Sequence, residues 1–225
     1  MYRPWALTLA ILSSSICLGQ LTIDKPHYDR LIITEKTDAR VTIGDLVIDT
    51  LIMETNSSLR FMLPHVAMRV NHAIVRKNVE WRGIGKTLDG KGGHGTNGVN
   101  LTLEVVFQEL DRLVIDTRGG SGSNGENGSN SMYSLHGQNG GRGGDGGNIN
   151  LRYRCNGFKP NLVEGKKSKA KTQAIVFKYE GGSGGLGGSA ASTNRLDNNG
   201  GIQYTGRPGD MGDKGKNGVL AVEEM

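Results

Sequence analysis

The sequence predicts an all-β protein in which parallel, solenoid-like strands are interleaved with packed glycine-rich segments of the polyglycine II type, with no substantial helix apart from a signal peptide. The first observation is a series of short apolar–polar alternations over residues 21–81, which is typical of strands. The second is a glycine at every third position in four later segments. The third is a repeat in which strand-like and glycine-rich segments return together.

Residues 1–20 have the features of a secretory signal peptide. Arg3 supplies a positive charge, an apolar run covers residues 5–12, and small polar residues precede a cleavage site after Gln20. The apolar run is too short to span a bilayer. Ile16 stands directly before Cys17, where a lipidation signal would carry a small residue, so the sequence favours simple cleavage. We therefore expect an exported protein, secreted to the extracellular space or held at the outer cell surface.

Residues 21–90 form the predicted β-rich N-terminal region. Short apolar runs follow one another closely, for example at 31–33, 46–48 and 51–53. Pro64 interrupts the one window with helical spacing, residues 59–75, and proline costs about 3 kcal/mol in a helix interior. Strands this frequent indicate a stacked arrangement in which each coil buries its apolar side on the next.

Residues 91–225 form the predicted glycine-rich repeat region with returning strands. The three-residue period runs through the segments 92–98, 118–147, 181–188 and 206–218. A polyproline II helix has three residues per turn, rises about 3.1 Å per residue and has no internal hydrogen bonds. Such helices can bond to one another side by side, because glycine has no Cβ to hold the backbones apart. A flexible Gly/Ser/Asn linker is the alternative, and the period in four segments favours packing.

An internal repeat joins the glycine segments to strands. Residues 99–104 match 149–154, and residues 113–122 match 175–184. A third return begins at Gly218, near the end of the chain. The connections within the unit, 107–112 and 156–172, differ in length, so they tolerate insertions. Because glycine is costly to order, we expect the flanking strands to act as the template for the glycine layer.

The GGxGG and GxxGxxG segments resemble the polyglycine II bundles of tail-fibre tip adhesins of some bacteriophages and of small springtail antifreeze proteins. The alternation of these segments with short strands is similar to secreted, glycine-rich, collagen-like repeat proteins of bacteria. The resemblance covers roughly residues 90–218 and is one of composition and period. It implies an exported structural or adhesive protein built on a bundle of glycine helices.

Composition argues against several functions. The formal net charge is +5, and the one dense lysine cluster, at 166–171, has no aromatic residues among it, so no nucleic-acid partner is expected. Cleavage after Gln20 would leave Cys155 as the sole cysteine, which excludes an intrachain disulfide. The sequence shows no phosphate loop or nucleophile elbow. We therefore predict no catalytic residue and no small-molecule cofactor.

No metal site is predicted either. The five histidines show no metal-ligand spacing. Residues 140–145 fit the first six positions of the calcium-binding nonapeptide, which would make Asp145 a cation ligand. However, Gly147 occupies the position that needs an apolar residue, and no tandem copy follows. The glycine period explains this segment better than calcium does.

Two segments interrupt the glycine period where a rod would turn back, residues 129–136 and 189–199. Loops on a rigid scaffold are where recognition residues concentrate, although a plain turn is an equal alternative. We predict that these tips contact a cell-surface glycan or protein through Met132, Tyr133, Leu135, His136, Arg195, Leu196 and Tyr204.

Ice binding is a rival function, but charged residues such as Arg142 and Lys214 stand between the glycines. The other rival function is that of a polysaccharide-active enzyme, in which Asp111 and Asp116 would be the paired catalytic acids.

Overall fold

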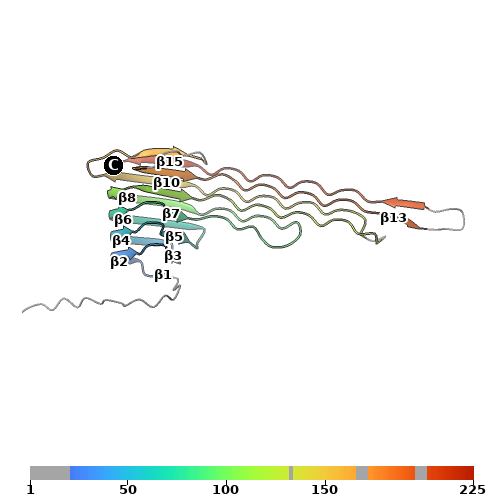
Figure 1. Cartoon of the computed structure of the whole chain (residues 1–225), viewed down its shortest axis with the longest axis horizontal. Coiled ribbons are helices and arrows are strands. Elements are labelled where there is room, and N and C mark those ends of the chain that lie inside the picture. Colours follow the sequence, from blue (N-terminus) through green and yellow to red (C-terminus); the bar gives the residue numbers. More distant parts are fainter. Residues whose placement is uncertain (1–20, 132–133, 166–171, 196–201) are drawn as a thin grey trace, which may run out of the picture.

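The computed structural model describes residues 21–131, 134–165, 172–195 and 202–225 (Figure 1). Strands and extended segments make up this part of the chain, and no described residue lies in a helix. In consequence, none of the described segments forms an apolar helix long enough to cross a membrane. The predicted signal peptide, residues 1–20, and the lysine cluster at 166–171 lie outside the described residues.

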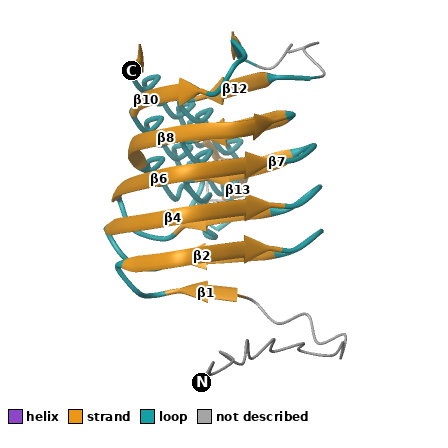
Figure 2. Ribbon diagram, turned by 90° about the vertical axis from the view of Figure 1, so that its left-hand side faces the viewer, coloured by secondary structure: helices purple, strands orange, loops and turns teal. Residues whose placement is uncertain are grey.

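Parallel strands form two sheets that face each other (Figure 2). Sheet A has seven strands in the order β1 (Leu21–Ile23), β3 (Asp38–Val41), β5 (Ser58–Phe61), β7 (Val79–Arg82), β9 (Arg112–Asp116), β12 (Ala174–Lys178) and β11 (Asn161–Glu164). Sheet B has six strands in the order β15 (Leu220–Glu224), β10 (Ile149–Cys155), β8 (Asn100–Leu110), β6 (His65–Val75), β4 (Asp45–Met53) and β2 (His27–Ile33). The chain passes from one sheet to the other at nearly every step, so the prediction of an all-β, parallel fold is confirmed.

The core lies between the two sheets and follows from the alternation in the sequence. In β4 every second residue is buried on either side of a break at residues 49–50, with Leu46 and Ile48 before it and Leu51 and Met53 after it. Parallel pairing places like positions above one another: Leu59 pairs with Trp81, and Trp81 with Ile115, and all three are fully buried. Each coil therefore completes the apolar layer of the coil below it.

The two corners of each coil are built differently. From sheet B to sheet A the chain turns tightly through residues in the left-handed region, Lys36, Asn56 and Asn78, at φ of 59°, 60° and 55°. From sheet A to sheet B, the first three connections are also brief, at residues 24–26, 42–44 and 62–64. The next coils carry long glycine-rich hairpins at this second corner. We name them hairpin 1 (residues 83–99), hairpin 2 (117–148) and hairpin 3 (179–219), and Figure 1 shows them running side by side away from the body.

Backbone hydrogen bonds join the hairpins at every third residue. Gly119, Gly122 and Gly125 of hairpin 2 donate to the carbonyls of hairpin 3 over 2.8–3.0 Å. Inside hairpin 2, Gly144 N donates to Gly120 O over 2.8 Å, which joins the returning segment to the outgoing one. Since extended glycine segments have no internal hydrogen bonds, these contacts satisfy backbone groups that would otherwise need water.

Glycine is needed where these backbones meet. A Cβ built on Gly143 would lie 2.0 Å from the carbonyl oxygen of Gly182, and one on Gly144 would lie 2.0 Å from that of Thr96. Both distances are far below van der Waals contact, so neither position accepts a side chain without separating the hairpins. The three-residue period of the sequence thus reflects the contacts between neighbouring segments.

Side chains between the glycines complete the network. Asn97 of hairpin 1 and Asn100, the first residue of β8, accept from the backbone N–H of Asp145 and Asn148, each over 2.8 Å. Asn148 in turn accepts from Val219 N of hairpin 3 over 2.8 Å. The asparagines that give these segments the composition of a flexible linker are therefore acceptors for neighbouring segments.

Two details differ from the sequence-based expectations. The connection at 156–172 contains β11, which covers the edge of sheet A beyond β12. The match of 99–104 to 149–154 is two residues out of register, because Ile149 pairs with Leu101 rather than with Val99. The match of 113–122 to 175–184 is confirmed over its strand, since Ile175 pairs with Leu113.

Candidate binding surfaces at the hairpin tips and at the root of hairpin 1

The three hairpins end at different distances from the body. Figure 1 shows hairpin 1 as the shortest and hairpin 3 as the longest. The outermost backbone bond between hairpins 3 and 2 runs from Ala191 N to Leu135 O, over 2.9 Å. At the same level, Gly206 N donates to Ala191 O over 2.8 Å, which joins the two segments of hairpin 3. Beyond them, β13 (Ser192–Arg195) and β14 (Ile202–Thr205) form an antiparallel pair. This distal ribbon makes no backbone hydrogen bond to the described residues of the other hairpins.

The predicted contact residues of hairpin 2 divide between scaffold and surface. Leu135 was predicted as a contact residue, but its side chain is only 8% exposed and offers little surface to a partner; its carbonyl accepts from Ala191 N. His136 is exposed, but its Nδ1 accepts from Arg207 N over 3.0 Å, which makes it one of the side-chain acceptors between hairpins. Met132 and Tyr133 lie outside the described residues.

The predicted contact residues of hairpin 3 belong to the distal ribbon. Arg195 is the last residue of β13, and Tyr204 pairs with Thr193 from β14. The Tyr204 side chain is 38% exposed. Leu196 lies outside the described residues. The hairpin 2 turn and the distal ribbon end at separate levels of the rod, so they do not form one continuous tip (Figure 1).

Asp145 has structural partners in the place of a cation. Its Oδ1 accepts from Lys216 N over 2.8 Å and pairs with the Arg142 guanidinium over 2.7 Å. The Oδ1 atom of Asp145 is therefore part of the contact between hairpins 2 and 3. The similarity of this segment to the calcium nonapeptide is therefore explained by the hairpin network.

The proposed acid pair of a polysaccharide-active enzyme is not assembled. Asp116 is the last residue of β9, while Asp111 comes just before its first, so about 17 Å of extended strand separates them. Paired acids of glycosidases stand roughly 5–9.5 Å apart. Asp116 is also 4% exposed and pairs with Arg118 over 2.8 Å, and this hydrogen bond raises the pKa of the Arg118 guanidinium.

One group of potential metal ligands comes together among the described residues. His27, Asp29 and Asp49 place ligand atoms within 4.8 Å of one another on the exposed face of β2 and β4. Asp49 also accepts from Asn71 over 2.8 Å. These side chains form a polar row across adjacent strands. The spacing of histidines in the sequence does not predict this row, because only the stacking of the coils brings the residues together.

No family model, curated protein or solved structure matches the chain. The function is therefore argued from the surfaces of the molecule itself.

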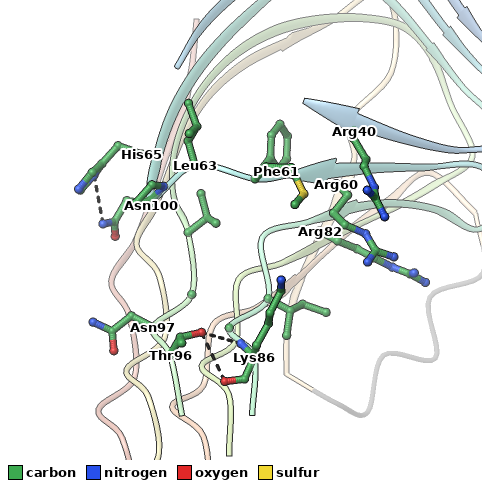
Figure 3. A pocket seen from close by; sticks show the side chains of 16 residues that line it. Arg40, Arg60, Phe61, Leu63, His65, Arg82, Lys86, Thr96, Asn97 and Asn100 are labelled. Atoms are coloured by element: carbon green, nitrogen blue, oxygen red, sulfur yellow. Dashed lines mark hydrogen bonds between the residues drawn. The ribbon is translucent and has the colours of Figure 1, made fainter. Parts of the chain in front are cut away.

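A second surface, absent from the sequence-based expectations, lies at the root of hairpin 1. A groove of about 810 Å³ occupies the inner corner between the turn at 62–64 and the two segments of hairpin 1 (Figure 3). We name it the root groove. Figure 3 shows Arg40, Arg60 and Arg82 grouped on one side of it, with Lys86 beside them and His65 on the opposite side.

The arginines of the root groove come from three successive coils. Arg40 pairs in register with Arg60, and Arg60 with Arg82. They point away from the core because each follows a buried residue in an alternating strand. One arginine per coil at the same strand position is the signal that could have revealed this row in the sequence.

Cys155 offers no reactive thiol, although it is not fully buried. Burial, followed by the negative charge of Glu224, raises the pKa of its thiol to about 11. The reactive thiolate is scarce below that pH. The alkylation rate of Cys155 at pH 8 should therefore be about a hundredfold lower in the folded chain than in the urea-unfolded chain, and it should rise as the pH approaches 11. Mass spectrometry of the Cys155 peptide measures this; equal rates in both states would contradict it.

Proposed function

We propose that the chain is an exported, non-enzymatic adhesive protein, in which a parallel β-solenoid body carries a polyglycine II bundle as a stiff rod. The distal ribbon of hairpin 3 contacts a surface glycan or protein. The single observation behind this proposal is that the hairpins leave the same corner of consecutive coils and bond to one another at every third residue. A tether between moving parts would not require such a network.

The cost of ordering supports a mechanical role for the rod. Fixing a residue costs about 1–2 kcal/mol in backbone entropy, and glycine loses the most conformational freedom. A long ordered glycine layer is useful when a surface must be held at a distance from the body. The distal ribbon occupies that position, and Tyr204 offers it an exposed aromatic side chain that also carries a hydroxyl.

The two rival functions have weaker support. Ice binding favours a flat, regular face of small polar groups, whereas the last segment of hairpin 3 presents Asp210, Asp213, Lys214 and Lys216. A polysaccharide-active enzyme would need paired acids, whereas the Asp116 carboxylate forms an ion pair with Arg118. An adhesive role requires neither feature.

The test is binding of the full chain to a glycan array and to cell surfaces, with a variant in which residues 192–205 are replaced by a short turn. This variant should keep the wild-type melting temperature, because the bonds at Ala191 and Gly206 remain. Its binding should fall below detection. Tyr204→Ala should weaken binding about tenfold, as expected for an aromatic contact residue.

Met211→Ala is the matched control, since Met211 is 70% exposed on the shaft of the same hairpin. Its binding should equal that of the wild type. Binding that survives the loss of residues 192–205 would reject the distal ribbon as the contact surface. Inhibition of ice recrystallisation, or release of reducing ends from a polysaccharide, would favour the corresponding rival.

A further inference from the structure

The root groove concentrates positive charge in a regular row. Arg40, Arg60 and Arg82 lie on adjacent parallel strands at paired positions. Neighbouring strands stand about 4.8 Å apart, so the row repeats at that spacing. Like charges this close repel one another, and a bound anion would relieve the repulsion.

The row is only partly neutralised by the protein. Arg60 pairs with Asp38 over 2.8 Å, and Arg82 pairs with Glu80. Among the described residues, no carboxylate lies within ion-pair distance of Arg40, and Lys86 adds a further positive charge to the groove. The Nε atoms of Arg40 and Arg60 are buried and have no hydrogen-bond partner in the described chain. An arginine fork is the group best suited to bind carboxylates.

Apolar side chains line the rest of the groove. Met62 and Leu63 of the turn are 40% and 36% exposed, and Ile84 of hairpin 1 is 41% exposed. They line the same groove as the arginine row, and Figure 3 shows Leu63 on the side of His65, across from the arginines. A ligand with one charged edge and one less polar face would match both walls.

We propose that the root groove binds an acidic polysaccharide that carries carboxylates at regular intervals. Such a polymer can offer successive carboxylates to successive coils and lay its sugar faces on Met62, Leu63 and Ile84. This site goes beyond the proposed contact at the distal ribbon: it holds the body on an acidic glycan layer while the rod points away. It does not depend on what the ribbon binds.

Other polymers fit the groove less well. Single-stranded nucleic acid is held by stacking on exposed aromatic rings, whereas Phe61, the one Phe, Tyr or Trp among the described residues that line the groove, is 4% exposed. An extended acidic peptide commonly adds a strand to a free sheet edge. The arginine row instead crosses the face of sheet A, where the strands are already paired on both sides.

The experiment is fluorescence titration of the full chain with a labelled galacturonic acid oligosaccharide. Its methyl ester, which has the same backbone without charge, is the ligand control. We expect binding of the acid form, weaker binding at high salt, and no binding of the ester. Arg40→Gln should weaken binding about tenfold, and Arg40→Gln with Lys86→Gln should abolish it.

Arg69→Gln is the matched protein control, because Arg69 lies on β6 in sheet B and pairs with Glu104 at the surface. It removes the same charge and should leave affinity unchanged. The proposal is overturned if the acid form does not bind, if the ester binds equally well, or if Arg40→Gln and Arg69→Gln behave alike. Tighter binding of a single-stranded DNA of equal charge would also reject it. Loss of the distal ribbon should not alter this affinity, so the two proposals fail separately.

Discussion

Gly143→Ala should lower the melting temperature by about 6–12 °C. Its Cβ would lie 2.0 Å from Gly182 O and 2.8 Å from Ser183 O, so hairpins 2 and 3 must separate locally. Overpacking costs about 1–3 kcal/mol, and each lost hydrogen bond adds about 1 kcal/mol. The gain from restricting the unfolded chain is only about 0.4–1 kcal/mol. A net loss near 3 kcal/mol, at about 2–4 °C per kcal/mol for a chain of this size, gives the stated shift.

Two control substitutions separate the effect of the close contact at Gly143 from the effect of changing a residue to alanine as such. Gly44→Ala adds the same methyl group, but the nearest atom to its Cβ would be His65 O at 3.9 Å, so stability should hardly change. The second control is Lys214, which occupies in hairpin 3 the position that Gly143 occupies in hairpin 2. This correspondence follows from the bond of Lys216 N to Asp145, two residues further along both segments. Lys214→Ala should also be neutral, since no described hairpin lies above it. Equal melting temperatures for Gly143→Ala and Gly44→Ala would refute the close contact.

Trp81→Ala should destabilise the body by about 3–5 kcal/mol, the usual cost of removing a large buried aromatic side chain. Trp81 is fully buried between Leu59 and Ile115 on adjacent strands, and its Nε1 lies 3.0 Å from Met53 Sδ. Urea unfolding followed by circular dichroism measures the loss. Because the strands hold the roots of the hairpins in register, the rod should lose its order in the same transition.

Ile32→Ala is the control for this substitution, because Ile32 is 45% exposed on the edge strand β2. It should cost well under half as much. A Trp81→Ala protein as stable as Ile32→Ala would contradict the assignment of Trp81 to the core. A body that unfolds while the hairpins keep their backbone bonds would contradict the role of the strands as a template.

The strands were predictable because their signal is local. In β10, apolar and polar residues alternate along one strand, and burial follows this pattern. The match of residues 113–122 to 175–184 also indicated true strand register, since Ile175 pairs with Leu113. The other match failed by two residues because alternation has a period of two, so a shift of two keeps every side chain on its expected face. The bonds from hairpin 2 to Asn97 and Asn100 accompany the observed register.

Features that depend on contacts between distant segments were not predictable from local pattern. Leu135 lies where the glycine period is interrupted, yet its side chain is buried and its carbonyl accepts from Ala191 of hairpin 3. His136 and Asp145 resemble functional residues, but each accepts a backbone N–H from hairpin 3. The root groove combines Arg40, Arg60 and Arg82 from three coils, and only the stacking of those coils unites them.

Amide hydrogen exchange of the glycines in hairpin 3 tests the central claim that the glycine segments pack against one another as ordered rods. Gly185 N donates to Gly141 O over 2.8 Å, whereas the adjacent Gly184 N has no acceptor in the described chain. We expect Gly185 to exchange orders of magnitude more slowly than Gly184. Exchange of both amides at the rate of an unstructured chain would contradict the account.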